Sequence, residues 1–238
     1  MFTCLLVYFV IFGCARHSPN KFGSALACTK ISSSTRLLTT MQQEPAINIE
    51  QHPLRPFLPE GAQVLMLGSF PPPRSKWSMD FFYPNYINDM WRIFGLVFKN
   101  DSDYFVDAAA KTFRLDLLRP FLEEKGIALY DTACAVRRLQ GNASDKFLEI
   151  VTPTDLDALL SQLPQCRAIV TTGGKATETL LAHFNAQLPK IGSYAAVRFA
   201  GRPLRLYRMP SSSRAYPLSL DKKAAYYKQM FLEIFSTR

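Results

Sequence analysis

The stretch Val64-Leu65-Met66-Leu67-Gly68-Ser69-Phe70-Pro71 decides which fold to expect from this chain. Four consecutive apolar residues followed by a glycine are typical of a buried strand that ends in a turn. A glycine directly after a strand lets a ligand approach the backbone closely, and the prolines that begin at Pro71 stiffen the loop. The same residues also suit a rigid turn that has no function.

After this stretch, strands and helices are expected to alternate along the chain. Further buried strands are predicted at 127–130 and 168–171, and a hairpin at 197–199 and 204–207. Helices are predicted at 88–97, 107–125, 152–163, 175–184 and 219–235, the third of them with Thr152 as N-cap and Pro153 in its first turn. This order predicts an α/β fold, a three-layer αβα sandwich around a mainly parallel central sheet. Ligands on such sheets bind at the carboxyl ends of the strands.

The composition is that of an ordinary globular protein. Of the 238 residues, 48% are hydrophobic and 20% are charged, which excludes a disordered chain, a collagen-like chain and a coiled coil. No apolar run reaches the roughly 18 residues that a spanning helix needs, so we expect no membrane association. The net charge of +9 favours a polyanionic partner, although a solvated basic surface explains it equally well.

The cysteines and histidines do not have the spacing of a metal site. No two of the five cysteines are two to four residues apart, and the three histidines are scattered. Cys134 and Cys166 are interpreted as small buried hydrophobic residues in a reducing compartment. We therefore expect no metal and no cofactor.

The N-terminus differs in character from the rest of the chain. Residues 1–15 are apolar, and residues 16–40 are rich in serine and threonine. One interpretation is an export signal, since Phe12-Gly13-Cys14 resembles a lipoprotein cleavage site; the other is a misassigned start codon, with the protein beginning at Met41 and remaining cytoplasmic. In either case we expect residues 1–40 to lie outside the fold and residues 41–238 to form one domain.

Two further motifs follow the predicted strands and loops. The first is Phe81-Phe82-Tyr83-Pro84-Asn85-Tyr86-Ile87-Asn88, in which aromatic rings suit stacking on nucleobases and asparagine suits reading a base edge. Alternatively, the aromatic residues are core and Asn88 is a helix cap. The second is Pro210-Ser211-Ser212-Ser213-Arg214-Ala215-Tyr216, whose hydroxyls and guanidinium suit phosphate binding, or simply form a polar loop.

Together these residues carry a family resemblance. Gly68-Ser69-Phe70-Pro71, then Phe82-Tyr83, Asn88 and Trp91, then Pro210-Ser211-Ser212-Ser213 resemble the uracil-DNA glycosylase superfamily. The pattern is most similar to the mismatch-specific and hypoxanthine-type enzymes, whose first motif reads GSMPG and continues to YY, HPxN and FW. This chain departs from the family at Pro72, where a glycine is usual, and at Asn85, where a histidine is usual. It also has Phe70 and Pro71 where the uracil-specific enzymes carry an aspartate, and Met209 where they carry a histidine.

The resemblance implies a monofunctional DNA N-glycosylase. Such a hydrolase flips a damaged base, uracil or a related deaminated base, out of the DNA and hydrolyses its N-glycosidic bond. The implied catalytic residues are Asn88, which would position the attacking water or read the base, and Asp131, which ends a predicted strand. For base binding it implies Gly68, the backbone amides of Ser69 and Phe70, and stacking by Phe82 or Tyr83. For DNA binding it implies Ser211, Ser212, Ser213, Arg214 and Tyr216.

The expected partner is DNA that contains damaged or mismatched bases, bound by a monomer. Two other functions stay open from the sequence. One is a catalytically inactive nucleic-acid-binding protein on the same fold. The other is an exported lipoprotein binding module, which requires the N-terminus to be a true signal.

Overall fold

The computed structural model of the chain describes residues 48–140 and 145–236. The predicted extension at 1–40 lies outside these residues, and so does the question of its processing. No helix in the described ranges combines the length and apolar character that crossing a bilayer requires.

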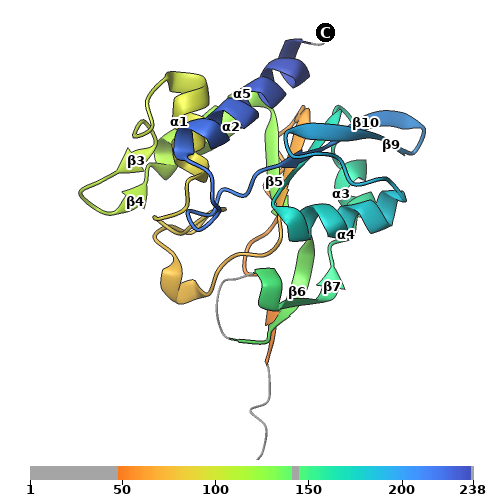
Figure 1. The fold of residues 1–238 in the computed structure, drawn as a ribbon, viewed down its shortest axis with the longest axis horizontal. Helices are drawn as coiled ribbons and strands as arrows, with labels where there is room; N and C mark the ends of the chain where they lie inside the picture. Colours follow the sequence, from red (N-terminus) through yellow and green to blue (C-terminus); the bar gives the residue numbers. More distant parts are fainter. Residues whose placement is uncertain (1–47, 141–144, 237–238) are drawn as a thin grey trace, which may run out of the picture. The chain divides into compact units, whose positions relative to one another are not determined.

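Five strands form the central sheet in the order β5-β2-β8-β10-β9 (Figure 1). Their bounds are β2 (Val64–Gly68), β5 (Ile127–Asp131), β8 (Ala168–Thr172), β9 (Ser193–Phe199) and β10 (Arg202–Met209). β2, β5, β8 and β10 run parallel, whereas β9 pairs antiparallel with β10. The sheet is therefore mixed, and the predicted mainly parallel sheet is corrected. The reason is the turn at Ala200 and Gly201, whose φ angles of 47° and 80° reverse the chain and pair β10 with the strand just before it.

Helices cover both faces of this sheet (Figure 1). Their bounds are α1 (Met90–Lys99), α2 (Leu115–Lys125), α3 (Leu156–Ser161), α4 (Gly174–Phe184) and α5 (Leu220–Ser236), with 3-10 turns η1 (Arg74–Lys76) and η2 (Asp145–Phe147). α1, α2 and α5 lie on one side, and α3 and α4 on the other. The chain crosses from β2 to β5 and from β5 to β8 in opposite directions along the sheet. Right-handed crossovers therefore place the connecting helices on opposite faces.

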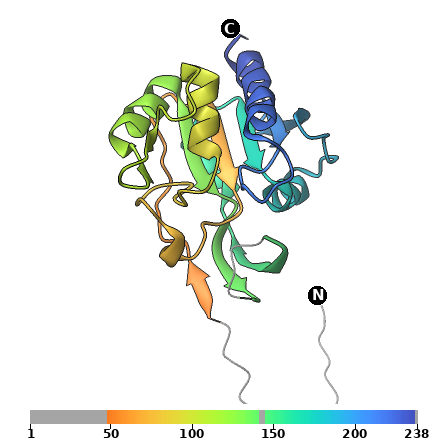
Figure 2. The same cartoon turned by 60° about the vertical axis from the view of Figure 1, so that its left-hand side comes forward.

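A second, antiparallel sheet was not predicted. It contains β1 (Ile49–Gln51), β6 (Ala133–Arg138) and β7 (Leu148–Pro153), in the order β1-β6-β7. β6 begins two residues after β5 ends, so this sheet extends from the carboxyl end of the central strands, as Figure 2 shows. A two-stranded hairpin of β3 (Val106–Asp107) and β4 (Thr112–Phe113) replaces the first turns of the helix predicted at 107–125.

The start predicted for the helix at 152–163 was also wrong. Thr152 and Pro153 belong to β7, opposite Ala135 and Ala133 of β6. The helix begins only at Leu156, with Asp155 as its N-cap, because the Asp155 carboxylate accepts a hydrogen bond of 2.9 Å from the Ala158 amide.

Candidate functional site

The carboxyl ends of three neighbouring strands meet at one place. In the register of the sheet, Gly68 of β2 lies opposite Asp131 of β5, and Leu67 lies opposite Thr171 of β8. A methyl group placed on Gly68 would collide with Asp131 Oδ1 and would lie 3.8 Å from Thr172 Oγ1. Glycine at this position therefore leaves room for the carboxylate above the end of β2.

A hydrogen bond between Asp131 and His52 joins the two sheets. Asp131 Oδ2 lies 2.8 Å from His52 Nε2, and the imidazole side chain is only 2% exposed. The imidazole packs against Tyr130, with ring centroids 4.7 Å apart, and edge-on against Phe70 at 5.3 Å. The backbone at Asp131 is held as well, because Thr154 Oγ1 donates a 2.7 Å hydrogen bond to its carbonyl oxygen.

Tyr83 reaches the same place from the loop before α1. Its hydroxyl lies 3.1 Å from Thr172 Oγ1. Burial raises the pKa of the Tyr83 hydroxyl well above its usual range, and the negative charge of Asp131 raises it further, so the hydroxyl stays protonated. The backbone at Tyr83 has φ of 49°, in the left-handed region that bulky residues rarely adopt. Such strain costs on the order of 1–3 kcal/mol and is commonly found at functional sites.

The loop after β2 is held from the second sheet. Arg138 of β6 donates a 2.5 Å hydrogen bond from Nη2 to the carbonyl oxygen of Pro71, and its Nε donates to both carboxylate oxygens of Glu50 at 3.0 Å. Its guanidinium also lies 5.6 Å from the centre of the Phe70 ring. Trp77 adds a 2.7 Å hydrogen bond from its indole to the carbonyl oxygen of Pro72. This loop is therefore fixed before any ligand arrives.

A second cluster joins the start of α1 to the serine-rich loop at 211–216. The Asp89 amide donates to the carbonyl oxygen of Ser212 at 2.9 Å, and the Asp89 carboxylate is contacted by Lys223 Nζ at 2.9 Å and Arg214 Nη2 at 2.8 Å. Lys223 Nζ also donates to the carbonyl oxygen of Ser213 at 2.7 Å. The serine loop is thus tied down by a buried carboxylate and a buried lysine.

Tyr83 lies between the two clusters. Its ring packs edge-on against Trp91, with centroids 5.8 Å apart. The hydroxyl of Tyr227, whose pKa is raised by burial and by Tyr83, donates 3.0 Å to the carbonyl oxygen of Pro210 at the start of the serine loop. The end of β2 and the serine loop are therefore parts of one packed region.

No protein-family model matches the sequence, and a search of curated proteins found no match. The fold is similar to a solution NMR structure described as "a putative Uracil DNA glycosylase from Methanosarcina acetivorans". The TM-score is 0.53 at 21% identity, and the similarity covers 79% of this chain and 99% of that chain.

This likeness establishes a shared fold. The resemblance to the uracil-DNA glycosylase superfamily and to its mismatch-specific members stays a prediction.

Most predicted base-binding residues are brought together. Gly68, Phe70, Tyr83 and Asp131 surround the end of β2, and Ser69 is buried in the loop between them. Phe82 is buried in the core, and the centre of its ring lies 6.4 Å from both the Tyr130 ring and the His52 imidazole. Whether these residues bind a base stays a prediction.

Other predicted residues belong to the second cluster. Asn88 Oδ1 accepts a 2.9 Å hydrogen bond from the Met90 amide, so this side chain caps the start of α1. The Arg214 side chain is 55% exposed but pairs with Asp89, whereas Ser212 is buried. Ser211 and Tyr216 are half-buried and Ser213 is exposed. Their roles in DNA binding stay predictions.

His52, Arg138 and Thr172 were missed from the sequence. His52 is 79 residues away from Asp131 along the chain, and no local pattern joins them. The small sheet that carries His52 and Arg138 to the site was itself not predicted. Thr172 lies just beyond the strand expected at 168–171, at the end where polar residues of the site were anticipated.

The described residues also show whether a cluster of side chains could bind a metal ion. No group of three or more His, Cys, Asp or Glu side chains among them has the arrangement of a metal site.

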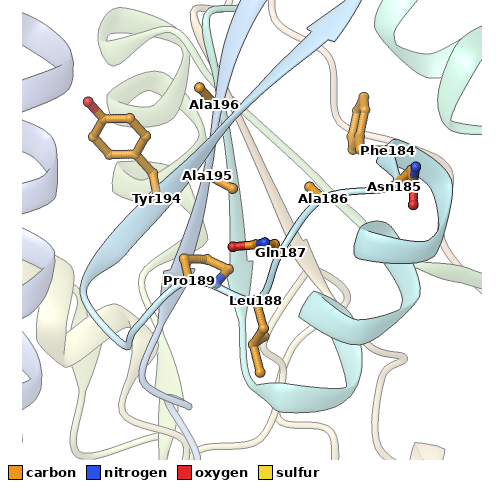
Figure 3. Close-up of a pocket in the computed structure, with 9 residues that line it drawn as sticks. All are labelled: Phe184, Asn185, Ala186, Gln187, Leu188, Pro189, Tyr194, Ala195 and Ala196. Atoms are coloured by element: carbon orange, nitrogen blue, oxygen red, sulfur yellow. The ribbon is translucent and has the colours of Figure 1, made fainter.

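A cavity of about 400 Å³ lies between the end of α4 and β9, lined by Phe184, Leu188 and Tyr194 among others (Figure 3). It is on the edge of the sheet that β9 forms, away from Asp131, and none of the side chains named above lines it.

Proposed function

We propose that this protein is a DNA glycosylase that removes uracil or a related deaminated base. The observation that carries the proposal is the apposition of Asp131 and Gly68 at the carboxyl end of β2, on a fold similar to that of a protein described as "a putative Uracil DNA glycosylase". Strand ends of this kind are where open α/β sheets bind their ligands.

The chemistry needs few groups. Cleavage of the N-glycosidic bond leaves a sugar with oxocarbenium character and a base anion, and the sugar cation is a strong electrophile that requires only a positioned water. The amides of Ser69 and Phe70 are proposed to bind the carbonyl oxygen of the leaving base, as an oxyanion site does. The fixed loop supports this role, since donors that need no reorganisation stabilise developing charge most effectively.

Asp131 is proposed to act as a hydrogen-bond acceptor at the end of β2. An ionised carboxylate has no hydrogen to donate, so Oδ1 binds a donor, which is the attacking water or a ring N–H of the base. Uracil and hypoxanthine both carry such an N–H, whereas cytosine and adenine have a lone pair on the corresponding ring nitrogen. Asn88 is proposed to assist from the start of α1 by orienting the water or reading the base edge.

The serine loop is proposed to hold the DNA backbone. We propose that Ser211 and Ser213 contact phosphates, and that Arg214 or Tyr216 fills the space that the flipped base leaves in the stack. The net charge of +9 supports a polyanionic partner. The protein acts as a monomer in this proposal, with no metal and no cofactor.

A panel of oligonucleotides tests the function. Each carries one uracil or hypoxanthine, as a single strand or as a mismatched duplex, and abasic product is detected by alkaline strand cleavage. The proposal predicts strand cleavage at the deaminated base and none at cytosine or adenine. Salt-dependent binding of all oligonucleotides without any abasic product would instead support a non-catalytic nucleic-acid-binding protein.

A further inference from the structure

The two oxygens of the Asp131 carboxylate have different surroundings. Oδ2 is bound by His52 Nε2 at 2.8 Å, whereas Oδ1 lies over Gly68, on the side where a Cβ would stand. Because a carboxylate only accepts hydrogen bonds, Nε2 carries the hydrogen in this contact. A quarter-turn of the carboxylate about its Cβ–Cγ bond would break the contact, so the imidazole fixes the plane of the carboxylate and keeps its second oxygen at the end of β2.

His52 is itself held on every side. Its imidazole lies among the rings of Tyr130, Phe70 and Phe82, at centroid distances of 4.7, 5.3 and 6.4 Å. Its Nδ1 accepts a 3.2 Å hydrogen bond from the Leu54 amide and also lies 2.9 Å from the Leu54 carbonyl oxygen. Because these contacts restrict the imidazole, its hydrogen bond also restricts the orientation of the Asp131 carboxylate.

The backbones of His52 and Asp131 are both linked to strand β6. The His52 amide donates 2.8 Å to the carbonyl oxygen of Cys134, and the residue before it, Gln51, pairs with Ala135 in the small sheet. Asp131 ends β5, two residues before the same strand β6 begins. Both partners are therefore attached to strand β6, His52 through its backbone hydrogen bond and Asp131 through the chain itself.

We infer that His52 is a positioning residue, which holds the Asp131 carboxylate so that Oδ1 is presented to the substrate at the end of β2. This inference rests on the proposed glycosylase function. In this account the small β1-β6-β7 sheet positions His52 beside the carboxylate of Asp131, which belongs to the central sheet. His52 contacts neither base nor sugar in this account and acts only through Asp131.

Kinetics of His52 variants test the inference. Loss of the donor in His52→Ala should lower kcat on the best deaminated substrate by about 10- to 100-fold with little change in KM, because small misplacements of a reacting group are costly. His52→Gln, which keeps an amide donor, should recover part of that loss. The matched control is His183→Ala, because His183 lies on α4 and pairs with Asp157 at 3.2 Å instead. The control should leave kcat unchanged.

A double-mutant cycle separates positioning from mere stability. If His52 acts through Asp131, then His52→Ala should cost no further activity in an Asp131→Ala background. Equal losses in both backgrounds, or a folded His52→Ala protein with the parental kcat, would overturn the inference.

A second readout does not depend on activity. In proton–nitrogen NMR spectra of the full chain, the Nε2–H proton of His52 should be protected from exchange with water, and Asp131→Ala should remove that protection. An inactive parent protein with this signal would refute the proposed function while leaving the pair intact. An active parent in which Asp131→Ala leaves the signal unchanged would refute the positioning role alone.

Discussion

Replacing Lys223 by methionine should destabilise the protein more than any surface substitution. Lys223 lies on α5 with its side chain 1% exposed, and its Nζ is bonded to Asp89 Oδ2 at 2.9 Å and to the Ser213 carbonyl oxygen at 2.7 Å. The Asp89 side chain is only 6% exposed. Methionine keeps most of the length of the side chain but leaves a buried carboxylate without its buried cation.

The magnitude follows from the burial of each partner. Removing one member of a buried ion pair typically costs about 3–5 kcal/mol, since the other charge remains desolvated. Here Arg214 still contacts Asp89 Oδ1 at 2.8 Å, so the lower end, about 3 kcal/mol, is expected. Arg214 is half exposed and screened by water, so Arg214→Ala should cost only about 1 kcal/mol or less.

Urea denaturation provides the assay, with Lys222→Met as the matched control because Lys222 is exposed on the same helix. The midpoint should fall in Lys223→Met with an unchanged slope, while Lys222→Met and the parent coincide. DNA affinity should fall as well, although Lys223 is too buried to touch DNA, because the serine loop loses its anchor. If the free energies of unfolding of the two variants agree within about 0.5 kcal/mol, the buried triad does not hold the loop.

Three further predictions concern Gly68, Asn88 and the buried tyrosines. Gly68→Ala should abolish base cleavage with a smaller effect on folding, because the new methyl group displaces the Asp131 carboxylate, as circular dichroism and single-turnover assays would show. Asn88→Asp should keep the melting temperature, since aspartate also caps α1, whereas Asn88→Ala should lower cleavage by at least about 100-fold if the amide takes part in the reaction. Burial raises the pKa of Tyr83 and Tyr227, so the folded state binds their protons more tightly than the unfolded state does. The melting temperature should therefore fall as the pH rises beyond about 10, and less steeply in Tyr83→Phe, whereas equal slopes would show that Tyr83 is not buried in solution.

The central strands could be predicted because they are continuous apolar runs. Three of them, Val64–Gly68, Ile127–Asp131 and Ala168–Thr172, are buried along their whole length. The small sheet could not be predicted, since β6 contains small and basic residues and β1 has only three residues. Thr152 and Pro153 look like a helix start, yet their pairing with β6 overrides that local preference.

Some residues of the site could be predicted from the sequence, and others could not. Gly68 and Asp131 could be predicted to meet because both end parallel strands, and the topology of such sheets fixes where strand ends lie. His52 could not be predicted, because its contact depends on a pairing between β1 and β6 that no local pattern in the sequence specifies. The capping role of Asn88 was foreseen as the alternative to catalysis, and the hydrogen bond to Met90 is compatible with both.

The most direct test of the account is the cleavage rate of Asp131→Ala on a deaminated base. The matched control is Asp116→Asn, because Asp116 is exposed on α2. Under single-turnover conditions the parent and the control should release uracil or hypoxanthine at the same rate. Asp131→Ala should be slower by at least about 100-fold, or about 2.7 kcal/mol of transition-state stabilisation, while DNA affinity is retained. A folded Asp131→Ala protein that cleaves at the parental rate would contradict the account.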